Sequence, residues 1–269
     1  MKKTLQIVNI LAFIAMIIFN YLSNKGLINH TTIGEVSQKL ENLFTPASYA
    51  FSIWGFIYVL LLGFVVYQSR SLFVTVRDDV FIMKTGGWFF LSCLANISWL
   101  FFWLYGYIGL SVIAMGVLLF SLLKIIVNNE MELWDAPISL IVFLWWPFVF
   151  YSGWISVATI SNVAAYLTFI NWDAGGIEVS IWAIIMVVFA GILNIFITWR
   201  RNMREFALVG SWALIAIAVS NWGVNSSLSY TSLGVAIVLV VSSGVHGYKN
   251  RHLGPLAKLK EYQSARKKI

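Results

Sequence analysis

Residues 138–170 read ISLIVFLWWPFVFYSGWISVATISNVAAYLTFI and contain no aspartate, glutamate, lysine, arginine or histidine. A helix crosses the roughly 30 Å hydrocarbon core of a bilayer with about 20 apolar residues. This stretch is therefore long enough for one tilted span or for two short ones. The choice decides which side of the membrane every later segment faces. If it forms one long helix, Pro147 is the expected bend.

The rest of the chain has the same apolar character. Of its 269 residues, 60% are hydrophobic and only 11% are charged, whereas an ordinary soluble domain has roughly 25% charged residues. A soluble core has too little volume to bury so much apolar mass, so soluble enzymes and disordered proteins are excluded. The single cysteine, Cys93, excludes an intrachain disulfide and a thiolate metal cluster. We predict an all-α membrane protein that has the lipid bilayer as a partner.

The placement of basic residues settles the number of spans. With one span in the long stretch, the chain holds eight apolar runs, near residues 4–23, 48–68, 87–107, 108–127, 138–165, 179–199, 207–222 and 230–248. If the N-terminus is cytoplasmic, only Lys25 and Lys39 of the 18 lysines and arginines face outward, as the positive-inside rule requires. A ninth span would place every basic residue from Arg200 onward outside.

We therefore predict a polytopic protein with about eight transmembrane helices, both termini cytoplasmic, in the cell (inner) membrane. The formal charge of +7 then reports orientation, and we expect no nucleic-acid partner. No aspartate, glutamate, lysine or arginine lies in the middle of a run, which argues against pumps, ion-coupled carriers and hydrolases. His246, near the inner end of the last run, is expected to be a packing residue.

The outer loop between the first two runs carries its own helical pattern. Apolar residues recur there at intervals of three and four, at Ile33, Val36, Leu40 and Leu43. Thr32 and Glu35 have the spacing of a capping box. We predict a short amphipathic helix, which is either a lid over the bundle or a segment resting on the membrane interface.

Aromatic and amide side chains keep helical register in three of the runs. The groups are Trp54 and Tyr58 in the second run, Asn96, Trp99 and Trp103 in the third, and Tyr151, Trp154, Ala158 and Asn162 in the fifth. Residues at this spacing share one face of a helix. Trp54 and Trp99 fall at similar depth, roughly 9–12 Å below the outer surface. Such faces either line a flat apolar pocket or simply pack the bundle.

The same residues belong to three motifs. Residues 45–58 read TPASYAFSIWGFIY, residues 96–99 read NISW and residues 150–162 read FYSGWISVATISN. In this order they resemble the signature of the TspO/MBR family of tryptophan-rich sensory or translocator proteins. That family has a proline-rich turn before Phe-x-x-x-Trp-x-x-x-Tyr, then Asn-x-x-Trp, and in its fifth helix Pro-Tyr-x-x-Trp-x-Ser-x-Ala-x-x-x-Asn. The resemblance covers about residues 5–172.

The resemblance implies a five-helix bundle whose pocket binds tetrapyrroles or other flat apolar molecules, in a ligand-binding or sensory role. No other cofactor and no metal are expected. The ligand-binding positions carried over by motif are Trp54, Asn96, Trp99, Tyr151, Trp154 and Ala158, and helical register adds Tyr58 and Asn162. Two alternatives stay open: an uncoupled transporter of apolar metabolites, and an enzyme that photo-oxidises a bound porphyrin through tryptophan.

The chain also departs from the family pattern. Phe150 stands in place of the proline, Ser92 in place of a common glutamine, and no basic residue follows Tyr166 closely, so sterol binding is unsupported. We divide the chain into a TspO-like domain (1–172), three additional helices (173–248) and a basic cytoplasmic tail (249–269). The additional helices either cover a face that shorter members use for dimerisation or bind a partner, and a homodimer is an open expectation.

Overall fold

The computed structural model describes residues 1–76, 79–252 and 254–266. Arg77 and the last three residues of the predicted basic tail therefore lie outside the described residues. Within the described part, all regular structure is helical, as the composition predicts.

Each of the eight apolar runs forms a helix. These are α1 (Lys2–Asn24), α3 (Ile53–Ser69), α5 (Trp88–Leu104), α6 (Ile108–Asn128), α8 (Trp146–Phe169), α9 (Val179–Arg201), α10 (Arg204–Ser220) and α11 (Ser226–Lys249). Six of the helical segments in the described residues are long and apolar enough to span a bilayer. The other two, α5 and α10, have 17 residues each, the lower end of the spanning range. The chain is an integral, polytopic membrane protein.

The long fifth run is one span. Helix α7 (Ile138–Leu140), a π-helical turn η3 (Ile141–Trp145) and α8 follow one another without a break. At the position of the predicted bend the structure has this π turn, just before Pro147. Proline has no N–H to donate to the carbonyl four residues earlier, and its ring crowds that turn. A wider π turn relieves this conflict without ending the helix.

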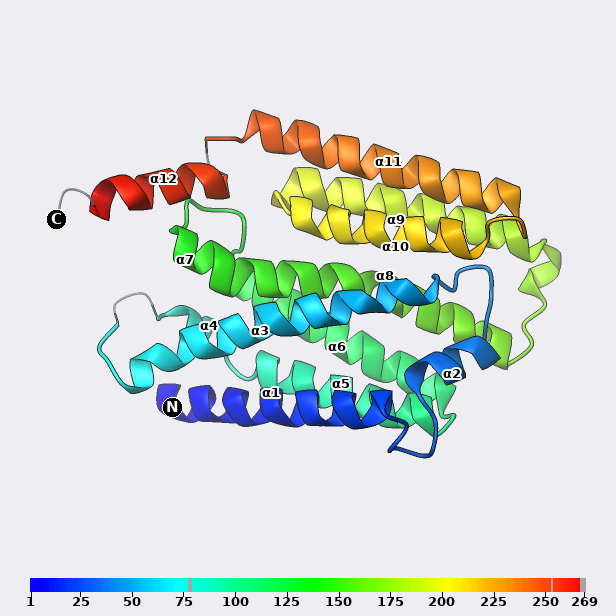
Figure 1. Ribbon diagram of the computed structural model, residues 1–269, viewed down its shortest axis with the longest axis horizontal. Helices are drawn as coiled ribbons and strands as arrows, with labels where there is room; N and C mark the ends of the chain where they lie inside the picture. The colour runs from blue at the N-terminus through cyan, green and yellow to red at the C-terminus, as the bar shows by residue number, and fades with distance from the viewer. Residues whose placement is uncertain (77–78, 253, 267–269) are drawn as a thin grey trace.

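Five helices form one bundle and three pack beside it. Helix α5 lies between α1 and α6, and α8 contacts α3 and α6. Helix α10 packs on α8, and α9 and α11 pack on α10 and on each other, which makes a second layer (Figure 1). Gly153 allows the close approach of the two layers, since a Cβ there would lie 3.2 Å from the Phe206 carbonyl oxygen.

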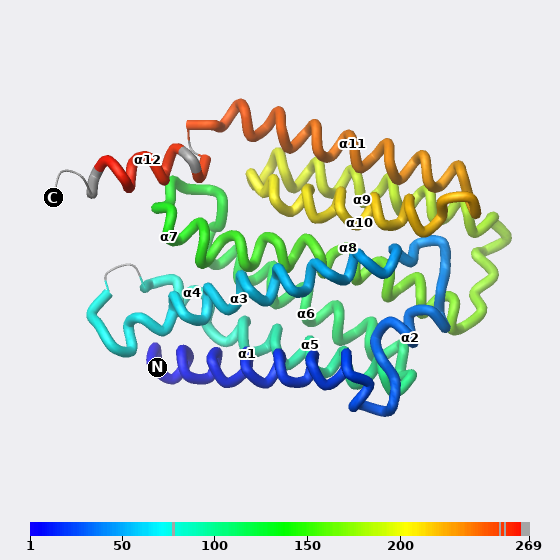
Figure 2. The backbone as a smooth tube through the Cα atoms, viewed as in Figure 1, coloured from blue at the N-terminus to red at the C-terminus, as the bar shows by residue number. Residues whose placement is uncertain are grey.

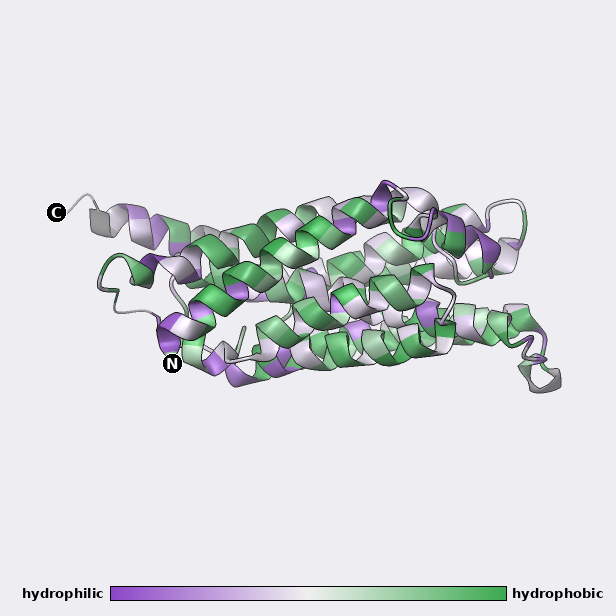
Figure 3. Ribbon diagram, turned by 90° about the horizontal axis from the view of Figure 1, so that it is seen from below, coloured by the Kyte–Doolittle hydropathy of each residue, from purple (hydrophilic) through white to green (hydrophobic). Residues whose placement is uncertain are grey.

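The N-terminus lies at the same end of the molecule as α4 (Phe81–Thr85) and α12 (Pro255–Arg266), the last described helix, whereas α2 (Ile33–Lys39) lies at the other end (Figure 1, Figure 2). Hydrophobic residues dominate the middle of the helices and hydrophilic ones gather toward the ends (Figure 3). This arrangement is the one that eight spans require. Which end is cytoplasmic stays a prediction.

Helix α12 is tied to the loop that precedes α7. The ammonium of Lys258 lies 2.7 Å from Asp135 and 2.9 Å from Glu261. The hydrogen bonds that Lys258 donates to these two carboxylates raise its pKa. The tail thus has contacts with the rest of the protein as well as its basic charge.

Candidate functional site: an aromatic cavity beneath helix α2

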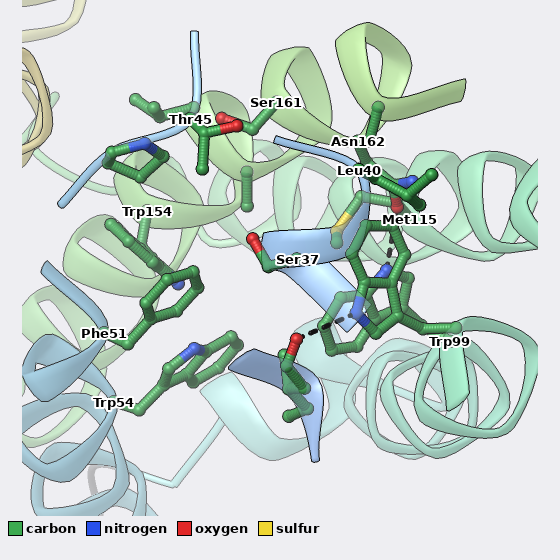
Figure 4. A pocket seen from close by; sticks show the side chains of 16 residues that line it. Ser37, Leu40, Thr45, Phe51, Trp54, Trp99, Met115, Trp154, Ser161 and Asn162 are labelled. Carbon is green, nitrogen blue, oxygen red and sulfur yellow. Dashed lines mark hydrogen bonds between the residues drawn. The ribbon is translucent and has the colours of Figure 1, made fainter. Parts of the chain in front are cut away.

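A cavity of about 60 Å³ lies inside the five-helix bundle, near the end that carries α2. Its walls come from α3, α5, α6 and α8, and α2 with the segment that follows it covers the cavity. Figure 4 shows Phe51, Trp54 and Trp154 on one side, Trp99 and Asn162 on the other. The lining residues are Ile33, Ser37, Leu40, Thr45, Pro46, Phe51, Trp54, Trp99, Trp103, Met115, Trp154, Val157, Ala158, Ser161, Asn162 and Ala165.

The structure brings five of the eight predicted binding residues to this cavity: Trp54, Trp99, Trp154, Ala158 and Asn162. They come from three helices, as their registers predict. The other three predicted residues, Tyr58, Asn96 and Tyr151, lie next to the cavity and do not line it.

The first wall is built from rings packed edge to face. The Trp54 and Trp154 centroids are 6.3 Å apart with an interplanar angle of 83°, and Phe51 meets Trp154 at 6.0 Å and 82°. Aromatic rings prefer this arrangement because the positive edge of one ring faces the negative face of the next. Trp154 is only 2% exposed, so the packing fixes its indole.

The opposite wall is a stacked pair anchored by an amide. Trp99 and Trp103 stack with centroids 5.8 Å apart. Trp99 Nε1 donates to Asn162 Oδ1 over 2.8 Å, and Asn162 Nδ2 donates to Ser111 Oγ over 2.9 Å. The amide oxygen and the amide nitrogen of Asn162 therefore both have partners within the protein. The bond to Asn162 holds Trp99 in place.

Tyr58, Asn96 and Tyr151 support Trp54. Tyr58 stacks on Trp54 at 5.4 Å, and Tyr151 meets it edge-on at 5.7 Å. Asn96 Nδ2 donates to the Tyr151 hydroxyl, and Asn20 Nδ2 donates to Asn96 Oδ1. The three residues predicted as ligand contacts therefore position a residue that lines the cavity.

Helix α2 lies over the cavity through Ile33 and Ser37, followed by Leu40 just after its end, so the predicted short helix exists and has the position of a lid. Its capping box forms as predicted: Glu35 N donates to Thr32 Oγ1, and Thr32 N donates to Glu35 Oε2. The bond from the Thr32 backbone lowers the pKa of Glu35. Trp103 Nε1 donates to the Ile33 carbonyl over 3.3 Å and attaches the lid to α5.

The segment after α2 is attached to α10. Asn221 Nδ2 donates to the Leu43 carbonyl over 2.9 Å. The Ala47 N–H donates to the Ala216 carbonyl, and Trp212 Nε1 donates to the Ala50 carbonyl. The additional helices thus hold the edge of the lid, a role that the sequence does not reveal.

Two polar atoms at the cavity lack partners among the described residues. Trp154 Nε1 and Ser161 Oγ are buried and make no hydrogen bond there. The lining carries no acidic or basic side chain, and no group of three described His, Cys, Asp or Glu residues is placed to hold a metal. The cavity therefore offers aromatic surface and hydrogen-bonding groups, with no acid–base pair.

Several cavity residues were not among the predicted contacts. Phe51 lies within the first motif and Trp103 within the register of Trp99, so the sequence carried a signal for both. Met115 had none, because no motif includes it and residues 108–127 are mostly apolar. His246 does not line the cavity. It is 3% exposed and packs edge-on against Trp199 at 5.2 Å, consistent with a packing role.

Comparison with known proteins agrees with these features. A family model described as TSPO-like protein matches residues 6–245, whereas no curated protein and no solved structure matches the sequence. The matched range includes α9, α10 and most of α11, and so extends beyond the residues that carry the motifs. The chain belongs to the TSPO-like family.

Proposed function

We propose that this membrane protein binds a tetrapyrrole-like or other flat apolar ligand in the aromatic cavity and acts as a sensor of that ligand. The observation that carries the proposal is the indole N–H of Trp154, which lies in a wall of aromatic rings and has no hydrogen-bond partner among the described residues. A buried donor without an acceptor costs about 1–3 kcal/mol. A planar ligand with an acceptor at its edge removes this cost and offers its face to the rings.

Ligand entry requires the lid to move. One water needs roughly 10–15 Å³ of cavity volume, so 60 Å³ holds about four to six waters and no tetrapyrrole. Helix α2 has only seven residues, most of its side chains are at least partly exposed, and Val36 is its buried residue. Outward movement of α2 and residues 40–46 is therefore the least costly way to enlarge the cavity.

The side chains packed behind the cavity favour binding of a ligand over its passage across the membrane. Tyr151 is fully buried, and it is linked to Trp54 by ring contact and to Asn96 by a hydrogen bond. These side chains fill the bundle on the side of Trp54 away from the cavity. Flux of bound ligand across liposomes separates the alternatives, since a sensor moves none and an uncoupled transporter moves it.

Titration with protoporphyrin tests the proposal. Ala158 lines the cavity, so Ala158→Phe should fill it and weaken protoporphyrin binding at least tenfold. Ala158→Gly is the matched control and should keep the wild-type dissociation constant. Equal affinity of the folded Phe variant and wild type would show that the porphyrin binds elsewhere.

A further inference from the structure

A second, larger cavity of about 740 Å³ lies between the five-helix bundle and the additional helices. Its walls are residues 160–171 of α8 and the following turn, residues 179–186 of α9, and the end of α10 at Ser220 and Asn221. Residues 41–44 line it as well. The volume falls within the 300–1,000 Å³ range of small-molecule sites.

The divergence of the two helical layers accounts for this space. Helices α8 and α10 are in close contact at Gly153, where a Cβ would press on Phe206 and Val209. Toward the end that carries α2, α8 diverges from α9 and α10 (Figure 1). The layers therefore part where the cavity opens, and the cavity does not share its lining with the aromatic cavity.

Polarity varies along the cavity. Val163, Leu167 and Met186 line its deeper part, whereas Asn42, Asn171 and Asn221 line the end near the surface. From Ile160 to Asn171 is eleven residues, roughly 16 Å at 1.5 Å per residue, about half of the 30 Å hydrocarbon core. The depth of the cavity thus matches the apolar part of one leaflet.

Two features place the mouth at the membrane interface. Trp172 and Trp182 line the cavity with ring centroids 5.6 Å apart, and tryptophan is enriched at the level of the lipid headgroups. On the same α9, Ile181 and Ile185 are 47% and 45% exposed, as expected for side chains that face lipid. A molecule in this leaflet is therefore beside the cavity and at the right depth.

The charge at the mouth indicates the kind of headgroup. Glu41 is the one charged residue among those that line the cavity. An ammonium group complements this carboxylate, whereas an anionic headgroup without an amine would be repelled. We propose that the cavity binds a single-chain amphiphile from the bilayer, with its apolar chain between α8 and α9 and an amine-bearing headgroup beside Glu41. This proposal does not rest on the proposed porphyrin site, because the two cavities share no lining residue.

Native mass spectrometry of the purified full chain tests the proposal with two probes, lysophosphatidylethanolamine and lysophosphatidylglycerol. Wild type should bind one lysophosphatidylethanolamine saturably and prefer it over lysophosphatidylglycerol. Ala183 lines the cavity and is 6% exposed, so Ala183→Trp should weaken this binding at least tenfold. Ile185→Trp adds the same side chain on the lipid-facing side of α9 and should bind as wild type does.

Two further variants complete the test. Ala164→Phe fills the cavity from α8 and replaces Ala183→Trp if that variant does not fold. Glu41→Gln should reduce the preference for the amine headgroup and leave folding unchanged. Unchanged binding in the folded filling variants, or equal binding of both probes by wild type, would overturn the proposal. Protoporphyrin affinity should be unaffected by Ala183→Trp, which separates this site from the aromatic cavity.

Discussion

At the scale of single residues, Trp154 and Trp99 differ in how their indole N–H groups are used. Trp99 donates to Asn162 within the protein, whereas Trp154 has no acceptor among the described residues. Both tryptophans belong to the motifs, and the motifs do not reveal this difference. Trp99 is therefore a fixed part of the cavity wall, whereas the indole N–H of Trp154 can donate a hydrogen bond to a ligand.

Trp154→Phe should therefore weaken protoporphyrin binding by about fivefold, because it removes one hydrogen bond of about 1 kcal/mol and keeps the aromatic surface. The dissociation constant follows from the shift of the porphyrin absorbance band. Trp222→Phe is the control, since Trp222 is 62% exposed at the end of the bundle. Equal losses in both variants would argue against a specific bond to Trp154.

Glu132, in the loop between α6 and α7, should make the stability of the protein depend on pH. Burial, followed by the nearby Glu205 carboxylate, raises the pKa of Glu132 to about 8. The folded state then binds more protons than the unfolded state between about pH 4.5 and 8, so stability should fall as pH rises through this window. Glu132→Gln should flatten the dependence of Tm on pH.

Thermal unfolding in detergent at pH 5 and pH 8 measures this difference. Glu178→Gln, in the linker before α9, serves as a control and should keep the wild-type pH dependence. If Glu132→Gln unfolds with the wild-type difference between the two pH values, Glu132 is not the source of it.

At the scale of elements, α2 can be predicted from the sequence but its role cannot. The spacing of Ile33, Val36 and Leu40, with Thr32 and Glu35, defines the helix. Whether it covers the bundle or rests on the interface depends on contacts distant in sequence, such as the bond from Trp103 to Ile33. Such contacts leave no local pattern.

Trp103→Phe should loosen this lid, because it removes that bond and keeps most of the ring. Hydrogen exchange of residues 33–39 should become faster, and the association and dissociation rates of protoporphyrin should both rise. Trp134→Phe, at the opposite end of the bundle, should change neither. Unaltered exchange in α2 would mean that the Trp103 bond does not hold the lid.

The two helical layers are in close contact at Gly153, between α8 and α10. Gly153→Val should lower the free energy of unfolding by about 1–3 kcal/mol, a typical cost of overpacking, because the new side chain meets the Phe206 carbonyl and Val209. Gly116→Val on α6 is the matched control, since no atom of another described element lies within 4 Å of a Cβ there. Equal thermal stability of the two variants would contradict the packing described for α8 and α10.

At the scale of the whole molecule, charge and hydropathy are enough to predict the helices and to place both termini at one end. Periodicity also brings Trp54, Trp99, Trp154, Ala158 and Asn162 together. It does not predict that Tyr58, Asn96 and Tyr151 lie behind Trp54. Helical register gives the face of the helix on which a residue lies, and it does not give how the side chain packs against the neighbouring helices. The 740 Å³ cavity could not be predicted either, since it depends on how far α8 diverges from α9 and α10.

The contacts of the additional helices could not be predicted from the sequence either. Nothing in residues 173–248 indicates that Asn221, Ala216 and Trp212 hold the segment from Leu43 to Ala50. Through these bonds α10 anchors the edge of the lid over the aromatic cavity, and its end at Ser220 and Asn221 lines the larger cavity. A homodimer and the cytoplasmic side of the termini stay predictions.

The dissociation constant of protoporphyrin in lipid nanodiscs shows whether the aromatic cavity is the ligand site. It is compared between wild type and the separate variants Trp54→Ala, Trp99→Ala and Trp154→Ala. We predict saturable quenching of tryptophan fluorescence in wild type and at least tenfold weaker binding in each folded variant. Saturable binding with an unchanged dissociation constant in all three variants would contradict the claim that the aromatic cavity is the ligand site.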